Sequence, residues 1–594
     1  MTGQAAEAIS TDKPIVSLSG KHWRLRPGND RLMQQIMQQA GLEPVVAQIL
    51  AARGFTIDQI PSYLQPKMRD LMPDPFSFKD MDKAVARILQ AIGAREKVAV
   101  FGDYDVDGAT SSALMMRFLR FVGLEPTLYI PDRVTEGYGP NVKAFQMLHE
   151  SGHTLIITLD CGVVAFEPMK YAADNKLDVV ILDHHMAAPE LPPAVAIVNP
   201  NRLDESGGFR YLAACGVTFM TLVALTQKLR DKNIEPPNLI DYLDLVALGT
   251  VCDVVPLIDL NRAFVSQGLK IMAGRKNTGL RALCDRANLE GKPTAYHAGF
   301  VLGPRINAGG RISVSQLGAT LLSTEDANTA IEISEQLEQL NRERQELEKR
   351  SVEEAIGIVA RDDSAFTHAI VLASRDWHPG VIGLIASRLK EQYQRPTCII
   401  ALDENGKGKA SGRSITGVDL GALVLKARME GLILEGGGHA MAAGFSLHDH
   451  QIPALLKFFT DELTKQYGPM LPPPEIAVDA ALAMKGVNLN VVRQLEQMEP
   501  FGANNSSPKL MLSPVRLERI DIVKEKHLRL HLTDDSNLQR LDVMYFGAAN
   551  GPVHRDLLKI GPQQRIALVG SLKNNSWQGR DKAQFIADDI ALVE

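Results

Sequence analysis

The sequence predicts an α/β protein of several domains: a domain with a parallel sheet, a long connecting helix, a second α/β domain and a C-terminal β-barrel. Three observations lead to this prediction. Apolar runs alternate with helical stretches up to about residue 320, a long helical pattern from about Asp326 to Ala360 has no Gly or Pro until Gly357, and strand-like alternation dominates after residue 508. A chain of 594 residues also exceeds what one hydrophobic core usually supports.

The first α/β segment is predicted from three apolar runs that end in acidic or histidine residues. Buried strands are expected at 97–101, 154–159 and 179–182, with helices near 111–121 and 166–175. Strands that alternate with helices form parallel sheets with covered faces. Ligands bind at the carboxyl ends of such strands, where the polar residues of this chain fall.

A second α/β segment and a β-rich segment follow the long helical run. The second α/β segment is expected to begin with a strand at 369–373 and a helix after Gly380, and to close near the prolines at 472–474. The last segment alternates apolar with polar residues, which predicts a small β-barrel or sandwich. Its clearest strand-like runs are 515–520, 527–532 and 565–569.

The composition excludes a membrane protein and a disulfide-stabilised one. No apolar run approaches the roughly 18 residues of a membrane helix. The N-terminus has no basic start followed by an apolar core, so we expect no secretory signal. The five cysteines have no paired spacing, which favours reduced thiols in a cytoplasmic protein over disulfides or a zinc site. They are Cys161, Cys215, Cys252, Cys284 and Cys398.

The net charge of −6 gives no support to a nucleic-acid partner, because binding to phosphates needs local positive charge. A total charge, however, does not describe how charge is distributed. Acidic residues in metal sites acquire bound cations, which reverse the local sign. The net charge therefore does not exclude such a partner.

The sharpest motif is the sequence DYDVDG, which places Asp103, Asp105 and Asp107 at every second position after a buried strand. If strand geometry persists, all three carboxylates point to one side. Carboxylates this close repel one another and have raised pKa values. Divalent cations relieve that repulsion, so the motif predicts a metal site.

Two alternatives to this interpretation are a calcium loop and a structural polar turn. The pattern D-x-D-x-D-G also begins an EF-hand loop. That loop requires a Glu at its twelfth position, where this chain has Leu114, and a helix before it, where a strand is expected. A purely structural turn remains open for this motif alone.

Three more polar clusters follow apolar runs. Asp160 ends the second strand, the pair His184 and His185 follows Asp183 at the third, and Asp253 lies in the sequence TVCDVVP. Alone, a strand-end Asp is usually a helix cap, and an Asp near Pro is a turn residue. Several strands of one sheet that end in acid or imidazole are a stronger signal for a metal site.

The donor types favour manganese or magnesium over structural zinc, because carboxylates and imidazoles are expected to act without thiolates. Cys161 and Cys252 adjoin candidate ligands, but neighbours on a strand face opposite sides, so both are expected to be small buried residues. Two divalent ions about 3.5–4 Å apart activate water and stabilise both oxygens of a phosphoryl displacement. A bridging carboxylate is needed to hold the ions that close.

The chain resembles the DHH phosphoesterase superfamily over roughly residues 75–590. Many motifs in the family's order carry this resemblance. They are DYDVDG (103–108), LDCG (159–162), DHH (183–185), CDVVPL (252–257), GPRINAGGR (303–311), SRDWHPGVIG (374–383), SGRS (411–414) and GGGHAMAAG (436–444).

The first residues form a loosely specified leader with helical patterning around 31–52, and the resemblance implies four regions after it. The expected regions are a leader (1–75), a DHH catalytic domain (76–320), a connecting helix (321–362), a DHHA1 domain (363–470) and a C-terminal OB-fold (471–594). OB-folds combine a basic groove with stacking aromatics. The candidates here are Lys524, Lys526, His527, Arg529 and Trp577.

The resemblance also implies roles for the clustered residues. One ion would be held by Asp103, Asp105 and Asp160, and the other by Asp107, Asp160, His184 and Asp253. Asp160 would thus bridge the two ions. His185 would contact the scissile phosphate. Asp183 would not contact a metal ion itself but would orient an imidazole.

The second half of the chain supplies candidate phosphate donors. Gly436–His439 is expected to be a flexible loop whose backbone can approach a phosphate closely. Arg413 beside Ser411 offers a guanidinium that can fork onto phosphate oxygens. A structural role is the alternative for each loop. The full set of expected substrate-binding residues is Arg305, Asn307, Arg311, Ser374, His378, Ser411, Arg413, Gly437, Gly438 and His439.

The function implied by the resemblance is a 5′→3′ exonuclease that acts on single-stranded DNA and releases 5′-mononucleotides, using Mn²⁺ or Mg²⁺. Such an enzyme is expected in DNA repair and recombination, near a helicase and a single-strand binding protein. One rival is a phosphoesterase of short oligonucleotides or nucleotides, which has no need of the added β domain. The other is a non-catalytic single-strand-binding scaffold, in which the metal ligands would be eroded; here every expected position is filled.

Overall fold

The computed structural model describes residues 14–132, 136–137, 139–536, 538–561, 564–577 and 579–593. The chain divides into two compact units. The larger unit comprises residues 66–460 and 500–505, and the smaller comprises residues up to 65, 461–499 and 506–594. Among the described residues, none of the helices has the length and apolar character required to span a bilayer.

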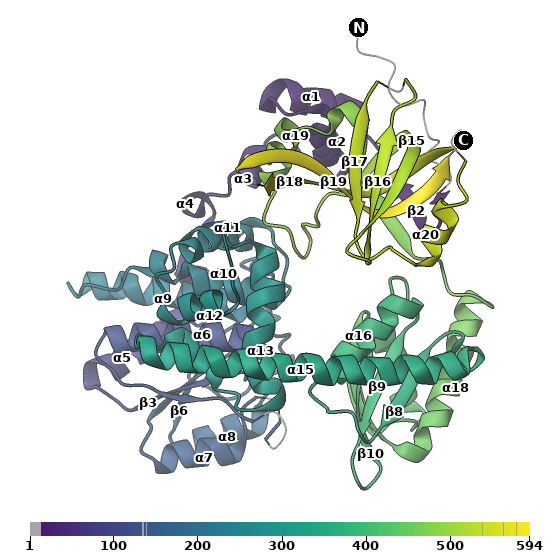
Figure 1. The fold of residues 1–594 in the computed structure, drawn as a ribbon. Coiled ribbons are helices and arrows are strands. Elements are labelled where there is room, and N and C mark those ends of the chain that lie inside the picture. The colour runs from purple at the N-terminus through teal and green to yellow at the C-terminus, as the bar shows by residue number, and fades with distance from the viewer. Residues whose placement is uncertain are drawn as a thin grey trace. The chain divides into compact units, whose positions relative to one another are not determined.

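The larger unit contains a five-stranded parallel sheet in the order β4-β3-β5-β6-β7, of which β3 and β6 are labelled in Figure 1. The strands are β3 (Val98–Gly102), β4 (Thr127–Tyr129), β5 (Leu155–Leu159), β6 (Asp178–Leu182) and β7 (Ala196–Val198). Every residue of β3 and β5 is buried, as expected when helices cover both faces.

The two faces of this sheet belong to separate hydrophobic clusters. Val98 and Val100 pack with one group of helices, while Ala99 and Phe101 pack with the other, because successive side chains of a strand point to opposite faces. The first group is α5 (Met81–Ala94), α6 (Val106–Phe121) and α9 (Ala214–Asp231), and the second is α7 (Val142–Glu150) and α8 (Phe166–Asp174). The parallel sheet predicted from the apolar runs is confirmed.

Further helices complete this part of the larger unit. Helix α10 (Leu243–Cys252) packs against α6, α9 and α11, and α13 continues directly from the π-helix η3. The remaining elements before the long helix are α4 (Met68–Leu71), η1 (Pro75–Ser77), η2 (Leu239–Tyr242), α11 (Asp259–Ala273), α12 (Thr278–Arg286), η3 (His297–Leu302), α13 (Gly303–Ile312) and α14 (Leu317–Ser323).

The predicted long helix is α15 (Ala327–Arg361), which begins where the Asp326 side chain accepts a hydrogen bond from the backbone N–H of Thr329. Its N-terminal part packs on α12, α13 and α14, and its C-terminal part packs on α16 (Figure 1). Ala355 and Val359 are fully buried in the core of the domain that follows. The helix is therefore part of two cores.

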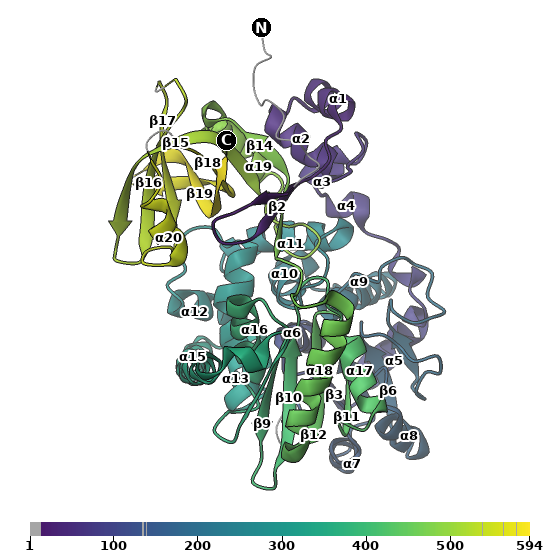
Figure 2. The same ribbon diagram turned by 90° about the vertical axis from the view of Figure 1, so that its right-hand side faces the viewer.

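The second α/β domain has a mixed five-stranded sheet in the order β11-β12-β10-β9-β8. Helix α16 packs against β9 and β10, and α17 packs against β11 and β12 (Figure 2). The elements are η4 (Asp363–Phe366), β8 (Ile370–Ser374), α16 (Ile382–Tyr393), β9 (Thr397–Leu402), β10 (Lys407–Arg413), α17 (Leu420–Met429), β11 (Glu435–His439), β12 (Ala442–His448), η5 (Asp449–Gln451) and α18 (Ile452–Tyr467).

The smaller unit contains a six-stranded sheet in the order β14-β15-β16-β17-β19-β18, in which β15 also pairs with β18 and so closes a barrel. This confirms the predicted C-terminal β domain. Its elements are β14 (Ala480–Leu482), η6 (Met484–Gly486), α19 (Leu489–Glu496), β15 (Leu510–Val523), β16 (His527–Thr533), β17 (Arg540–Tyr545), α20 (Pro552–Leu557), β18 (Arg565–Trp577) and β19 (Arg580–Val593).

The expected leader differs from the structure, because its described residues up to 65 fold with the C-terminal unit. Strand β2, labelled in Figure 2, pairs in parallel with β13. The indole of Trp23 donates to the buried carboxylate of Asp589, and Arg53 forms two hydrogen bonds with Asp479. These long-range partners leave no local sequence signal. The elements are β1 (Ile15–Val16), β2 (His22–Leu25), β13 (Glu475–Val478), α1 (Asp30–Ala40), α2 (Pro44–Ala52) and α3 (Ile60–Leu64).

Candidate metal centre and substrate site

The turn after β3 positions the first three aspartates, but not by strand alternation. Asp105 is the N-cap of α6, and its carboxylate accepts a hydrogen bond from the backbone N–H of Gly108 at 3.0 Å. Asp107 lies in the first turn of that helix. The helix begins five residues earlier than expected from Ser111, so the assumption of continuing strand geometry was wrong. Asp103 is nevertheless near Asp105, because the turn folds back at the helix start.

Gly108 makes that turn possible. A Cβ atom built on it would lie 2.4 Å from the carbonyl oxygen of Asp103. A side chain at this position would push the helix away from the strand end. The Gly of the DYDVDG motif is thus explained by close backbone approach.

Asp107 is held by the N-terminus of another helix. Its Oδ2 accepts a hydrogen bond from the backbone N–H of Ala214 at 2.6 Å, and its Oδ1 accepts one from Cys215 at 2.9 Å. Free N–H groups at a helix start favour a carboxylate. Gly249 of α10 lies against the same group, since its Cβ would be 2.9 Å from Oδ1 of Asp107. Sequence reasoning missed both the donors and the glycine, because neither forms a motif with Asp107.

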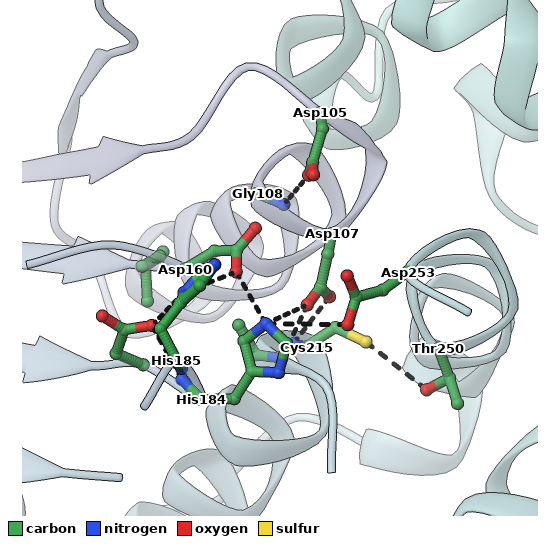
Figure 3. A network of polar contacts seen from close by, with 12 residues as sticks. Asp105, Asp107, Gly108, Asp160, His184, His185, Cys215, Thr250 and Asp253 are labelled. Atoms are coloured by element: carbon green, nitrogen blue, oxygen red, sulfur yellow. Dashed lines mark hydrogen bonds and ion pairs between the residues drawn. The ribbon is translucent and has the colours of Figure 1, made fainter. Parts of the chain in front are cut away.

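His184 lies among three aspartates that come from separate parts of the chain (Figure 3). Its Nε2 is 3.2 Å from Oδ1 of Asp160, 3.6 Å from Oδ2 of Asp253 and 4.0 Å from Oδ2 of Asp107. Asp253 is the C-cap of α10. Asp160 follows β5 and has a left-handed φ of 62°, which Asp tolerates better than most residues.

Asp183 differs from the other aspartates because it is saturated with hydrogen bonds. Its Oδ1 accepts from the backbone N–H groups of His184 and His185 and lies 2.7 Å from Nδ1 of His185, while Oδ2 accepts from Val163. Burial opposes its ionisation, but the bonds from His185 and the backbone lower its pKa. Burial also works against the charge of His185, yet the bond to Asp183 raises the pKa of that imidazole to about 9.

The ligand atoms form three overlapping groups, in each of which all atoms lie within 4.8 Å of one another. Asp160 belongs to two of them, and so does His184. The groups are Asp103–Asp105–Asp160, Asp107–His184–Asp253 and Asp160–His184–His185. The structure therefore brings together all six residues predicted as metal ligands.

Two observations test whether this cluster fits divalent cations. Within the described parts of the chain, Nε2 of His184 and Oδ2 of Asp253 are buried and have no hydrogen-bond partner. Such atoms are costly unless a ligand satisfies them. Burial and the neighbouring carboxylates also raise the pKa of Asp107, of Asp160 and of Asp253, the last to about 9. Bound cations relieve both costs, so the residues present fit two metal ions.

The cysteines near this cluster are not poised as ligands. Burial and the nearby Asp103 raise the pKa of Cys161, and burial likewise raises the pKa of Cys252. The Cys161 thiol lies 3.4 Å from the carbonyl oxygen of Leu159. All five cysteines are free thiols. Both positions therefore match the prediction of small residues that pack rather than coordinate.

The GPRINAGGR residues lie on α13, where two of the expected donors have protein partners. Arg305 donates from Nε to Glu338 of α15 at 2.6 Å and from Nη1 to the carbonyl of Val301. Arg311 donates to the carbonyl of Gly380 at 2.9 Å. Asn307 is half-buried on the same helix. Arg305 thus ties α13 to α15, and Arg311 joins the two α/β domains.

The start of α16 lies beside Ser411 and Arg413. The strand end at Ser374 and the loop at His378 precede this helix in the chain. Ser374 ends β8, and Nδ1 of His378 accepts a hydrogen bond from the backbone N–H of Gly380. A Cβ on Gly383 would lie 3.0 Å from Oγ of Ser411 and 3.1 Å from Nη2 of Arg413. The serine and the guanidinium therefore face the first turn of a helix, where unpaired N–H groups favour anions.

Gly436–His439 is not the expected flexible loop. It belongs to β11, which pairs antiparallel with β12, with Gly437 opposite Gly444 and His439 opposite Ala442. Strand β12 also pairs with β10, where Ser411 is opposite Gly444 and Arg413 is opposite Ala442. Directly paired residues share a face of the sheet, so Ser411, Arg413, Gly437 and His439 face one side. Gly438 is required for close approach, because its Cβ would lie 2.4 Å from the Ala442 carbonyl oxygen.

The candidates of the C-terminal barrel gather at one hairpin. Lys524 and Lys526 are exposed in the turn between β15 and β16, and Arg529 is exposed on β16. The ring of His527 makes an edge contact with Phe546, which is itself exposed. The side chain of Trp577 lies outside the described residues. The hairpin offers the cations and an aromatic surface, as expected for an OB-fold.

Three family models match separate parts of the chain. The DHH family N-terminal domain matches residues 97–250, the DHHA1 domain matches 364–465, and the RecJ OB domain matches 478–589. Each match falls on a domain described above. The boundaries of the five predicted regions are not tested by these matches and stay a prediction.

Curated proteins and solved structures match the chain as a whole. The single-stranded-DNA-specific exonuclease RecJ of Bacillus subtilis is 34% identical over 97% of this chain and 71% of that protein. The protein of the same name from Escherichia coli is 33% identical over 93% and 96%. The crystal structure of RecJ with Mn²⁺ from Thermus thermophilus matches with a TM-score of 0.80 at 28% identity, covering 96% of this chain and 80% of that one. Its Mg²⁺ complex matches with a TM-score of 0.74 at 27% identity, covering 96% and 78%.

Proposed function

This chain belongs to the RecJ family of single-stranded-DNA-specific exonucleases, and we propose on that premise that it digests single-stranded DNA in the 5′→3′ direction and releases 5′-mononucleotides. The observation that carries this proposal is the meeting of four separated chain segments in one acidic cluster around His184 (Figure 3). Relatives of this fold have been crystallised with Mn²⁺ and with Mg²⁺, and these two ions are the cofactors that we propose here.

In this proposal one ion is held by Asp103, Asp105 and Asp160, and the other by Asp107, Asp160, His184 and Asp253. Asp160 is shared because it stands between the groups and lies 3.2 Å from His184. Two divalent ions at such a site polarise the phosphate and stabilise the charge that develops on its oxygens. Backbone N–H groups hold two of these ligands in place. Asp107 accepts a hydrogen bond from Ala214 at the start of α9, and Asp105 accepts one from Gly108.

His185 acts beside the metal ligands in this proposal. In the metal-free protein burial lowers the pKa of its imidazole, but the hydrogen bond to Asp183 and the nearby carboxylates raise it to about 9, and its ring is half-exposed. An imidazole whose Nδ1 is paired with a carboxylate suits contact with the scissile phosphate. Asp183 keeps the ring oriented through the 2.7 Å bond to Nδ1. Loss of Asp183 therefore acts through His185 rather than on the substrate directly.

The start of α16 is proposed to receive the 5′ end of the strand. Ser411 and Arg413 lie against the first helical turn at Gly383, and Ser374 and His378 belong to the neighbouring strand end and loop. A 5′-phosphate fits this combination of guanidinium, hydroxyls and helix N-terminus. The remaining proposed contacts to the strand are Arg305, Asn307, Arg311, Gly437, Gly438 and His439.

The wider context is part of the same proposal. We propose a cytoplasmic role in DNA repair and recombination, in which a helicase supplies single strands and a single-strand binding protein presents them. The division into a catalytic domain at 76–320, a connecting helix at 321–362, a phosphate-binding domain at 363–470 and a DNA-binding domain at 471–594 completes it. The free state of all five cysteines is consistent with a reducing compartment.

Digestion of end-labelled DNA tests the proposal. Single strands labelled at the 5′ end should release labelled mononucleotide at once with Mn²⁺, while strands labelled at the 3′ end should lose label only after many turnovers. Blunt duplex and reactions with chelator should stay intact. Products longer than one nucleotide, or equal release from both ends, would contradict the proposed reaction.

A further inference from the structure

Two aromatic side chains stand exposed on the catalytic domain without a role in the mechanism. Tyr296 is 64% exposed and Phe300 is 72% exposed. Their rings are stacked, with centroids 5.2 Å apart and an angle of 24° between the planes. Large apolar side chains that stay exposed as a group indicate a binding surface.

The helix that carries this pair is pressed against the end of α10, which holds Asp253. On its inner face Ala298 and Leu302 are fully buried, and the carbonyl oxygen of Ala298 lies 3.4 Å from the thiol of Cys252. A Cβ on Gly303 would lie 2.6 Å from the same sulfur. The segment from His297 to Leu302 is a π-helix, a rare form that is frequent at functional sites. The helix that carries the pair is therefore held against the end of α10, where the proposed ligand Asp253 is the cap.

Val254, the residue after Asp253, is another exposed apolar side chain at the end of α10. It is 69% exposed and has a φ of +60°, a left-handed conformation that is unfavourable for a β-branched residue. The backbone N–H of Val254 donates a hydrogen bond to the carbonyl oxygen of Val251 at 3.3 Å, which closes the turn. The conformation holds an apolar side chain in solvent next to a proposed metal ligand. Strain of this kind is found at functional sites.

We propose that the stacked rings of Tyr296 and Phe300 form a surface on which nucleobases of the single strand stack as it approaches the metal centre, with Val254 at the end of α10 as a further apolar contact. The proposal rests on the proposed exonuclease function and specifies how the bases are held. Phosphates are bound by cations and metals, but the bases need an apolar partner. Stacking on aromatic rings suits an enzyme that must accept every base, because each base has a π-face.

The double variant Y296A/F300A tests this inference on DNA with and without bases. On ordinary single strands its KM should rise about tenfold, while kcat at saturation stays within about twofold. On strands with abasic sites near the 5′ end, wild type and variant should have equal KM values. The conservative variant Y296F/F300Y should behave like wild type on both substrates.

F121A is the matched control, because Phe121 is also an exposed aromatic, 55% accessible, at the far end of α6. It lies 14 residues beyond Asp107, about 20 Å along the helix axis. F121A should leave KM unchanged on every substrate. An unchanged KM for Y296A/F300A on ordinary DNA would overturn the inference, as would an equal rise on abasic DNA. If only stimulation by single-strand binding protein is lost, the surface serves a protein partner and the inference is also overturned.

Stacking can be measured without hydrolysis, which separates this inference from the proposed reaction. DNA carrying 2-aminopurine at successive positions is bound to metal-free protein, and its fluorescence is recorded. Wild type and F121A should quench the probe at one or two positions near the 5′ end, and Y296A/F300A should not. Quenching in wild type without digestion after Mn²⁺ addition would reject the exonuclease but keep the stacking surface. Equal quenching in all three proteins would reject the surface alone.

Discussion

Asp160 is the residue on which the proposed metal centre depends most. It belongs to two ligand groups, is buried to 2% exposure, and lies near Asp107, Asp105, Asp103 and Asp253. Its left-handed backbone conformation restricts what can replace it, since Asn tolerates φ > 0 whereas Ala does so poorly. Asp160→Asn is therefore a cleaner substitution than Asp160→Ala.

We expect Asp160→Asn to lower kcat by about a thousandfold, because the bridging charge contributes several kcal/mol to stabilising the transition state. The same variant should unfold at higher denaturant concentration than wild type when metal is absent, because it removes one of several repelling carboxylates. Activity assays with Mn²⁺ and urea unfolding with chelator measure the two effects. Retained manganese-dependent digestion would defeat the bridging role.

The raised pKa values at this centre predict a proton release when metal binds. Burial and the charges of Asp107 and Asp105 raise the pKa of Asp253 from 3.8 to about 9, so its carboxyl holds a proton at neutral pH. Metal ligation requires the carboxylate, so binding displaces that proton. Calorimetric titration of Mn²⁺ at pH 7.5 in two buffers of different ionisation enthalpy should show release of at least about one proton per protein. Buffer-independent heats would contradict this.

The raised pKa of Asp253 also determines how the stability of the metal-free protein changes with pH. A carboxyl whose pKa is higher in the folded state binds more protons there, so its contribution stabilises the fold below about pH 4 and is lost as pH rises towards 9. The centre alone thus makes the metal-free protein less stable at pH 8 than at pH 5. Saturating Mn²⁺ should reverse that contribution, because ligation favours the deprotonated form.

At the scale of elements, the close packing of α10 on α6 and α9 determines where Asp253 lies. Gly249 sits at this contact, where a Cβ would lie 2.3 Å from Oγ1 of Thr110 and 2.7 Å from Sγ of Cys215. Helix α10 must move outward if this position carries a side chain. The last turn of α10 and its cap, Asp253, then move with it.

We expect G249A to destabilise the larger unit by about 2 kcal/mol through overpacking and to weaken Mn²⁺ binding. The control is G357A on α15, where a Cβ meets no atom within 4 Å. That substitution should stabilise by up to about 1 kcal/mol, since Ala is the better helix former. Thermal unfolding and metal titration of both variants test the pair. Equal behaviour of G249A and G357A would contradict the packing argument.

The sequence predicted strands better than it predicted how their ends are shaped. Apolar runs with acid or imidazole after them identified β3, β5 and β6 and the polar residues at their ends. The full set of six ligands came from the family resemblance, since Asp253 lies at the end of a helix rather than a strand. The early start of α6 at Val106 was missed, because Asp105 caps the helix while also belonging to the motif. The GGGH segment was expected to be a loop from its glycines, but it pairs with β12, whose small residues lie opposite. Cross-strand pairing is not visible in one segment.

For the whole molecule, the structure joins the N-terminal residues to the C-terminal unit. Arg53 of α2 binds Asp479 through Nε at 2.9 Å and Nη2 at 3.0 Å, with both side chains largely buried. Trp23 bonds to Asp589 at 3.1 Å. Partners more than 400 positions apart cannot be inferred from periodicity. A deletion beyond residue 474, intended to remove only a DNA-binding domain, would therefore also strip partners from the N-terminal elements.

We expect R53A to destabilise the smaller unit by about 2 kcal/mol, because it removes two charge-assisted hydrogen bonds from the buried carboxylate of Asp479, which keeps Arg26 at 3.2 Å and the backbone N–H of Lys509. R24A is the matched control, since Arg24 pairs with Glu475 on the surface and both side chains are about half-exposed. It should not change unfolding measurably. Denaturant unfolding of the full chain compares them. Identical midpoints for R53A and wild type would contradict the proposed joining of the two ends.

The proposed chemistry requires two divalent ions around Asp160. A crystal soaked in Mn²⁺, with anomalous diffraction recorded at the manganese edge, should show two peaks about 3.5–4 Å apart, with Asp160 in contact with both and His184 and Asp253 at only one. An empty cluster, or manganese bound elsewhere on the chain, would contradict that requirement.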